Sequence, residues 1–300
     1  MTKTRRLRPM ILLTVLVMMA AILGVWTWTE HSQTDPSLNF DGERAVLDVQ
    51  TQLSFGPRIP GTQGHQKAIA YIQNTLVKSG WVTELQQTTW DGYPIQNIIA
   101  KRGDGNPWII LGAHYDTRIW ADQDLDAAKR QDPVPGANDG ASGVSVLLEL
   151  ARILPKTLNK QIWLVFFDYE DDGGIQGRDW ILGSRAFTAN LQGKPDAVVV
   201  VDMVGDANLN IYRERNSTPE LADQIWSSAT RLGFSQQFID RAGYSILDDH
   251  TPFLEAGIPA LDIIDFDYPF WHTTADTADK ISATSLQIVG KVLTSWLTGK

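Results

Sequence analysis

The distribution of apolar and polar residues along this chain predicts six strands. Two of them, 81–89 and 94–101, are expected to form a β-hairpin. The other four are near-continuous apolar runs, as expected for strands buried on both faces, at 108–113, 162–167, 197–201 and 258–264. Helices are predicted at 41–53, 66–79, 144–153, 181–190, 221–232 and 282–297. Strands that alternate with helices predict an α/β fold, a three-layer α/β/α arrangement around a central mixed, mostly parallel sheet.

The first 39 residues follow a different pattern. Residues 1–9 are basic, and residues 10–28 carry no charge over nearly the ~20 residues that a membrane-spanning helix needs. The positive-inside rule then predicts a cytoplasmic segment 1–9, a transmembrane signal anchor at 10–28 and a linker at 29–39. Residues 40–300 would form an extracytoplasmic catalytic domain. A cleaved signal peptide, and so a secreted domain, is the alternative.

Composition narrows the chemistry. The net charge is −9, and no basic cluster occurs beyond the N-terminus, so nucleic acid is not expected as a partner. Cysteine is absent, which excludes disulfides, cysteine-based zinc fingers and a cysteine nucleophile. Histidine and carboxylate side chains remain as candidate metal ligands.

Acidic and imidazole groups follow the same end of four predicted strands. In mostly parallel sheets, ligands bind beyond the carboxyl ends of the strands, so these groups are expected to meet. The groups are His114 and Asp116, Asp168 to Asp172, Asp202 and Asp206, and Asp265 and His272. The glycine-rich "PGANDGASG" adds Asp139 just before a helix. Imidazoles with carboxylates and no thiolate suit zinc in an open catalytic site.

The stretch "FFDYEDDGG" places four carboxylates within five residues, and a bound cation would offset their repulsion. We expect Asp171 to coordinate the metal and its neighbour Glu170 to face the substrate as general acid/base. Asp116 is expected to orient His114 or a neighbouring ligand. Asp168 and Asp172 receive no role and are expected to be solvated.

In order and spacing, the motifs "HYDTR", "PGANDGASG", "FFDYED", "VDMVGD" and "FWHTTADT" resemble those of the zinc exopeptidase superfamily. This superfamily includes aminopeptidases and zinc-type glutaminyl cyclases. The resemblance implies a di-zinc ligand set and Glu170 as the base. The implied ligands are His114, Asp139, Asp171, Asp202 and His272. The peptidases usually have Glu-Glu where this chain has Glu170-Asp171.

Three features resemble the cyclase branch. Asp248 stands before Asp249-His250, where peptidases tend to have a small polar residue. Trp271 precedes the implied ligand His272, and Trp180 follows the acidic pair. The resemblance implies that both tryptophans line a glutamine pocket.

The expected function is therefore zinc-dependent conversion of N-terminal glutamine of peptides or proteins to pyroglutamate, with release of ammonia. Glu170 would be the base, with Asp202 and Asp248 in support. One zinc per chain is expected, held by Asp139, Asp171 and His272. A di-zinc aminopeptidase, with His114 and Asp202 completing a second site, is the alternative, and an inactive extracytoplasmic binding domain is the third. The catalytic domain is expected to be monomeric.

Overall fold

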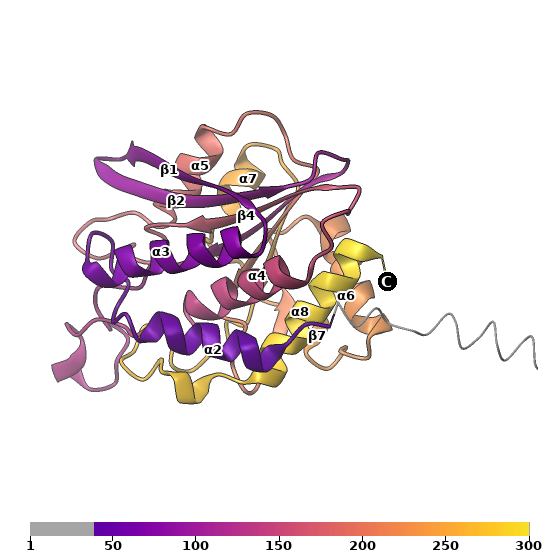
Figure 1. Ribbon diagram of the computed structural model, residues 1–300. Helices are drawn as coiled ribbons and strands as arrows, with labels where there is room; N and C mark the ends of the chain where they lie inside the picture. The colour runs from indigo at the N-terminus through magenta and orange to yellow at the C-terminus, as the bar shows by residue number, and fades with distance from the viewer. Residues whose placement is uncertain (1–38, 300) are drawn as a thin grey trace, which may run out of the picture. The chain divides into compact units, whose positions relative to one another are not determined.

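A six-stranded sheet forms the centre of the protein, in the order β1-β2-β4-β3-β5-β8 (Figure 1). The computed structural model describes residues 39–299. The strands are β1 Val82–Trp90, β2 Tyr93–Arg102, β3 Trp108–His114, β4 Gln161–Phe167, β5 Ala197–Asp202 and β8 Ala260–Ile264. Strands β4, β3, β5 and β8 are parallel neighbours, whereas β2 is antiparallel to both β1 and β4. This confirms the expected mixed, mostly parallel sheet and the hairpin.

Helices cover both faces of the sheet, as the three-layer prediction requires (Figure 1). Successive strand residues point to opposite faces. Ile109 and Leu111 of β3 belong to the larger core, beneath α2, α3, α4, α6 and α8, whereas Ile110 faces the smaller core beneath α5 and α7. The helices are α2 Gly42–Leu53, α3 Gln63–Lys78, α4 Ala141–Ile153, α5 Leu182–Ala189, α6 Pro219–Arg231, α7 Thr251–Glu255 and α8 Ala283–Thr298.

Two short strands and one short helix were not predicted. β6 Ile211–Arg213 and β7 Phe238–Ala242 form a separate two-stranded parallel sheet, and α7 follows the acidic segment that ends at His250. Each of these elements has five residues or fewer. A run that short is too brief to establish a hydrophobic period.

Phe40, near the start of the described residues, packs into the larger core. Phe40 is fully buried, and a Cβ atom at Gly290 of α8 would overlap its ring. The next residue, Asp41, caps α2 by accepting a hydrogen bond from the backbone N–H of Arg44 (3.0 Å). The backbone N–H of Asp41 donates to the buried Glu149 of α4 (3.2 Å). Glycine at position 290 is therefore required by the packing of Phe40.

The prediction of a membrane-anchored, extracytoplasmic domain is corrected. The segment 10–28, on which it rested, lies outside the described residues. Among residues 39–299, no helix is both long enough and apolar enough to cross a bilayer.

Candidate metal centre and active-site pocket

The side chains expected to form the site do lie together, beyond the carboxyl ends of the parallel strands. β3 ends at His114 and β5 at Asp202, while the acidic run follows directly after β4. His272 lies in the loop after β8. Asp139 lies just before α4. The register of the sheet brings His114 close to the acidic run, because His114 pairs with Phe167, the last residue of the neighbouring β4.

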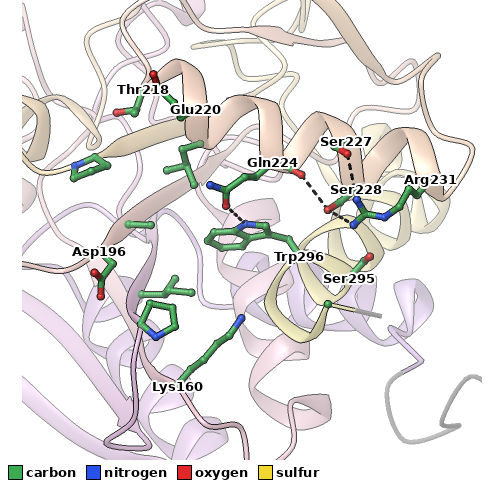
Figure 2. Close-up of a pocket in the computed structure, with 16 residues that line it drawn as sticks. Lys160, Asp196, Thr218, Glu220, Gln224, Ser227, Ser228, Arg231, Ser295 and Trp296 are labelled. Atoms are coloured by element: carbon green, nitrogen blue, oxygen red, sulfur yellow. Dashed lines mark hydrogen bonds between the residues drawn. The ribbon is translucent and has the colours of Figure 1, made fainter.

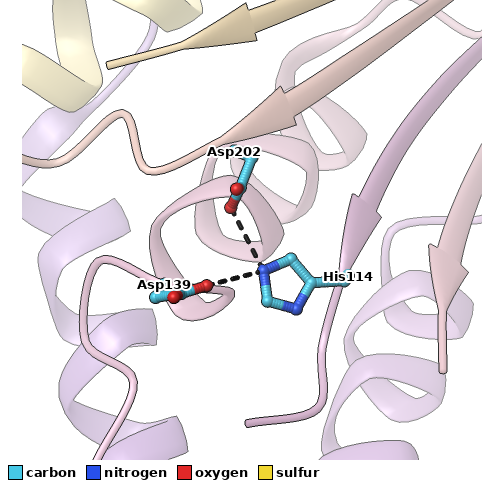
Figure 3. Close-up of side chains that lie close together, drawn as sticks. All are labelled: His114, Asp139 and Asp202. Atoms are coloured by element: carbon cyan, nitrogen blue, oxygen red, sulfur yellow. Dashed lines mark hydrogen bonds and ion pairs between the residues drawn. The ribbon is translucent and has the colours of Figure 1, made fainter. Parts of the chain in front are cut away.

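Asp139 links two groups of candidate metal ligands. Its Oδ1 atom lies 3.0 Å from Nε2 of His114, which is also 3.1 Å from Oδ1 of Asp202 (Figure 3). Its Oδ2 atom lies 3.5 Å from Nε2 of His272, which is 2.9 Å from Oδ1 of Asp171. In each group of three residues, the ligand atoms all lie within 4.8 Å of one another.

The loop that carries Asp139 is tied down from two sides. The buried carboxylate of Asp276 accepts hydrogen bonds from the backbone N–H groups of Asn138 (2.8 Å) and Asp139 (3.1 Å). The guanidinium of Arg58, which is fully buried, donates to the carbonyls of Pro135 (3.0 Å) and Gly136 (2.6 Å). Neither Arg58 nor Asp276 was singled out from the sequence.

Three buried carboxylate oxygens of the second group have no hydrogen-bond partner. Oδ2 of Asp139 and both carboxylate oxygens of Asp171 are buried and accept no hydrogen bond. By contrast, Nε2 of His114 and Oδ1 of Asp202 are hydrogen-bonded to each other. Buried carboxylate oxygens are normally paired or bound to a metal, because an unpaired charge is costly to bury. Nitrogen and oxygen donors without thiolate suit zinc, so these residues fit the metal that the sequence implied.

Asp116 binds the backbone of both Glu170, the expected base, and Asp171, the expected metal ligand. Its Oδ1 atom accepts from the backbone N–H of Glu170 (3.2 Å), and its Oδ2 atom from that of Asp171 (3.3 Å). Oδ1 also lies 3.5 Å from Nδ1 of His114. One buried carboxylate therefore connects the end of β3 to the acidic run after β4.

Burial perturbs the acids that face the pocket. It raises the pKa of Glu170 well above its ordinary value; His114 opposes this, while Asp171, Asp248 and Asp249 add to it. Burial likewise raises the pKa of Asp202 to about 7, against the lowering effect of His114. A carboxyl group whose pKa is about 7, as that of Asp202 is, can both accept and return a proton near neutrality.

Two tryptophans flank His272. The ring of Trp271 stacks on the imidazole at 3.7 Å between centroids and 25° between planes. Trp180 is nearly parallel to the same imidazole, with 5.9 Å between centroids and an angle of 12°. A Cβ atom at Gly173 would overlap the indole of Trp180, so only glycine leaves room for the ring there.

One pocket of about 260 Å³ gathers these groups. Its lining includes the base expected from the sequence, two further carboxylates and both tryptophans: Glu170, Asp202, Asp248, Trp180 and Trp271. Asp139, Asp171 and His272 also line it, so the candidate metal ligands open into the same space. Exposed apolar side chains, Tyr244 and Leu247, form part of its rim.

A larger hollow of about 670 Å³ lies near the first residues of β3 and β5, beside α6 and α8 (Figure 2). There the indole N–H of Trp296 donates to Gln224 (3.0 Å). Lys160 donates to a carbonyl of α8 (2.6 Å), and Arg231 donates to Ser228 (2.9 Å). These polar groups make structural hydrogen bonds, and neither metal-ligand group borders this hollow.

The expectation that Asp168 and Asp172 are solvated is wrong, because both are buried. Asp168 is 2.8 Å from Nε2 of His65 and accepts from the backbone N–H of Gln96 (2.8 Å). Asp172 pairs with Arg178 at 2.7 Å. The two acids therefore fix the ends of the acidic run, which leaves its middle two residues to face the pocket.

The chain belongs to peptidase family M28, whose sequence model matches residues 97–297. A solved glutaminyl cyclase of Bacteroides thetaiotaomicron is 34% identical and superimposes with a TM-score of 0.83, covering 87% of this chain and 99% of that one. A solved protein described as a leucine aminopeptidase precursor of Bacteroides thetaiotaomicron VPI-5482 is also 34% identical and superimposes with a TM-score of 0.83. The match covers 87% of this chain and 98% of that one.

The curated relatives also include both cyclotransferases and an aminopeptidase. The Bos taurus glutaminyl-peptide cyclotransferase is 26% identical, over 94% of this chain and 93% of that protein. The aminopeptidase YwaD of Bacillus subtilis is 28% identical over 85% of this chain, but the match spans only 56% of that enzyme. The family and the zinc-exopeptidase type of fold expected from the motifs are thus confirmed.

Proposed function

We propose that this protein is a zinc-dependent glutaminyl-peptide cyclotransferase, which converts an N-terminal glutamine to pyroglutamate and releases ammonia. The observation that carries the proposal is the composition of the 260 Å³ pocket. It combines a buried glutamate, two further carboxylates and two tryptophans around one group of candidate metal ligands. The full-length similarity to solved bacterial glutaminyl cyclases supports it.

In the proposed reaction, the α-amine of the substrate attacks the carbon of its own γ-carboxamide. Glu170 accepts a proton from the amine as the new C–N bond forms. It then returns the proton to the departing nitrogen, which leaves as ammonia when the old C–N bond breaks. Asp202 and Asp248 are proposed to hold the amine and the leaving nitrogen. Trp180 and Trp271 are proposed to fix the glutamine side chain in the geometry that closes the ring.

Asp139, Asp171 and His272 are proposed to hold one zinc ion. Zinc bound there supplies Lewis-acid polarisation of the carboxamide carbonyl. The choice of this group rests on its buried carboxylate oxygens that accept no hydrogen bond. In the other group, His114 is already bonded to Asp139 and Asp202. That bonding supports a single metal ion.

A di-zinc aminopeptidase is the second candidate. The observation in its favour is that the two carboxylate oxygens of Asp139 face different histidines, as a bridging ligand would. In that function, Glu170 would activate a water molecule against a peptide bond. A third candidate, an inactive domain of the same fold, would turn over neither type of substrate.

One experiment separates the three candidates. The purified protein is incubated with a glutamine-initiated peptide and, separately, with leucine anilide, each with and without a zinc chelator. Chelator-sensitive release of ammonia from the peptide supports the cyclase. Release of the anilide instead supports the aminopeptidase, and turnover of neither supports the inactive domain.

We also propose that residues 40–300 form the catalytic domain and that it acts as a monomer on the N-termini of peptides or proteins. Residues from Phe40 onward form one compact unit, which supports the boundary. Light scattering at assay concentration would test the oligomeric state, and a dimer mass would contradict the proposal.

A further inference from the structure

Glu214 is a buried carboxylate that the proposed reaction does not use. It follows β6 and is only 5% exposed. Its Oε2 atom accepts hydrogen bonds from the backbone N–H groups of Asn216 (2.9 Å) and Ser217 (2.7 Å) and from the Ser217 hydroxyl (2.9 Å). Its Oε1 atom accepts from the backbone N–H of Ile246 (3.0 Å). The bond to Ile246 joins two segments that are 32 residues apart.

The same carboxylate also meets His250. Nε2 of His250, a fully buried side chain, lies 3.3 Å from Oε2 of Glu214. Ile246 and His250 stand two residues before and two residues after Asp248. Glu214 therefore holds the chain on both sides of Asp248, one of the carboxylates that line the active-site pocket.

The segment around Asp248 needs such an attachment because Asp248 lies among other carboxylates, which repel its charge. The charge of Asp248 acts on the carboxyl group of Asp262, which is fully buried on β8 and accepts no hydrogen bond. The charges of Asp202 and Glu214 act on Asp262 as well. Like charges placed this close favour any movement that separates them. A segment that carries a carboxylate into this region must be held by contacts elsewhere.

Glu214 can hold the segment because its own charge is compensated. Burial would raise its pKa, but the nearby imidazole of His250 and the hydrogen bonds from the backbone N–H groups of Ile246 and Asn216 lower it to about 2. The carboxylate is thus ionised wherever the enzyme could work, and it offers strong hydrogen-bond acceptors to the segment.

We propose that Glu214 and His250 are positioning residues that set Asp248 in the active-site pocket by holding the chain on either side of it. This inference rests on the proposed cyclotransferase function. Neither residue touches the pocket. Their effect on the reaction is therefore indirect and passes through the segment that carries Asp248, in which Ile246 also lines the pocket.

The first test is Glu214→Gln. The amide oxygen can still accept from Asn216 and Ser217, but the amide NH₂ would then face the N–H of Ile246 and break that bond. We expect kcat for ammonia release from a glutamine-initiated peptide to fall about 10- to 100-fold, as for other residues that orient a reacting group. Zinc content should stay at the wild-type value, because Glu214 contacts no candidate ligand.

A double-mutant cycle separates positioning from a general loss of stability. If Glu214 acts through Asp248, Glu214→Gln should change kcat by less than about 3-fold once Asp248→Asn is present. Glu149→Gln is the matched control, because Glu149 is also a buried carboxylate held by several donors, Arg44 and Arg152 among them. It should lower the melting temperature and leave kcat unchanged in both backgrounds.

The outcomes are distinct. If the Glu214→Gln effect is equally large with and without Asp248→Asn, the inference is overturned, although the cyclotransferase function stands. If the wild-type protein releases no ammonia, the proposed function itself fails. Should Glu214→Gln not fold, His250→Asn is put through the same cycle, and equal effects in both backgrounds there reject the inference as well.

Discussion

Glu170 and Asp171 are adjacent, yet their environments differ as their expected roles require. Glu170 lines the pocket beside Asp248, whereas both oxygens of Asp171 are buried next to His272. Because the backbone N–H groups of both residues are held by Asp116, neither side chain is needed to keep the turn in place. Substitutions at the two positions should therefore have separable effects.

Replacing Glu170 with glutamine preserves size and removes the base. We expect ammonia release to fall by ~10²–10⁴, while zinc content stays at the wild-type level. The measurement is steady-state turnover of a glutamine-initiated peptide, with elemental analysis of the same sample. Activity near the wild-type value would reject Glu170 as the base.

Asp171→Ala should differ from Glu170→Gln in its zinc content. It removes one of three candidate ligands, so zinc and activity should be lost together. Elemental analysis after dialysis checks this, and Glu170→Gln serves as the control that keeps its metal. Stoichiometric zinc in Asp171→Ala would mean that the roles of the two neighbours are exchanged.

The loops after the strands carry the backbone strain of the fold. Tyr169, Met203 and His272 all have positive φ, at 51°, 46° and 54°. Each lies in a segment that follows a strand at the site. Left-handed backbone at such residues costs ~1–3 kcal/mol and persists only where surrounding contacts impose it. For His272, the imposing contacts are the flanking tryptophans and the two carboxylates.

Gly173→Ala tests whether the indole of Trp180 matters for the reaction. The added methyl group would overlap that ring and force it away from His272. We expect kcat/KM for a glutamine-initiated peptide to fall at least ~10-fold, with zinc retained.

Gly174→Ala is the matched control. It has open space around its Cβ position but a φ of 74°. It should therefore cost ~1–2 kcal/mol of stability without altering kcat/KM. Equal loss of kcat/KM in both variants would show that the loop, and not Trp180, is responsible.

The four parallel strands of the central sheet, β3, β4, β5 and β8, were predictable because burial on both faces leaves a continuous apolar run. β6 and β7 gave no such pattern, since "IYR" and "FIDRA" are short and partly polar. The same limit applies within the site. Carboxylates directly after strands could be found from the sequence, but Glu214 lies in the polar run "RERNS", and its contacts with Ile246 and His250 arise only from the folding of distant segments.

For the whole molecule, the metal count is the first prediction. We expect one zinc per chain after dialysis against metal-free buffer, measured by elemental analysis. The reason is that both buried oxygens of Asp171, which belongs to only one of the two described ligand groups, accept no hydrogen bond. Two tightly held zinc ions, with His114→Ala losing one of them, would favour the aminopeptidase.

The stability of the fold should depend on Glu214 in acid. Its pKa is about 2 in the folded protein, below its ordinary value of 4.5. The ionised group therefore stabilises the fold above pH ~4.5, and this contribution is lost as the pH falls toward 2. The difference in free energy of unfolding between wild type and Glu214→Gln should shrink over that range by up to ~1.4 kcal/mol per pH unit. A difference that stays constant from pH 5 to 2.5 would contradict this.

The packing of Phe40 limits how many residues can be removed from the N-terminal end of the chain. Its ring fills the space that Gly290 leaves open on the last helix, and Asp41 next to it begins the first helix of the domain. A fragment that starts at residue 42 would retain every candidate catalytic side chain but would expose an apolar groove along α8 and leave α2 uncapped. Recombinant fragments for crystallisation or assay should therefore start no later than Phe40.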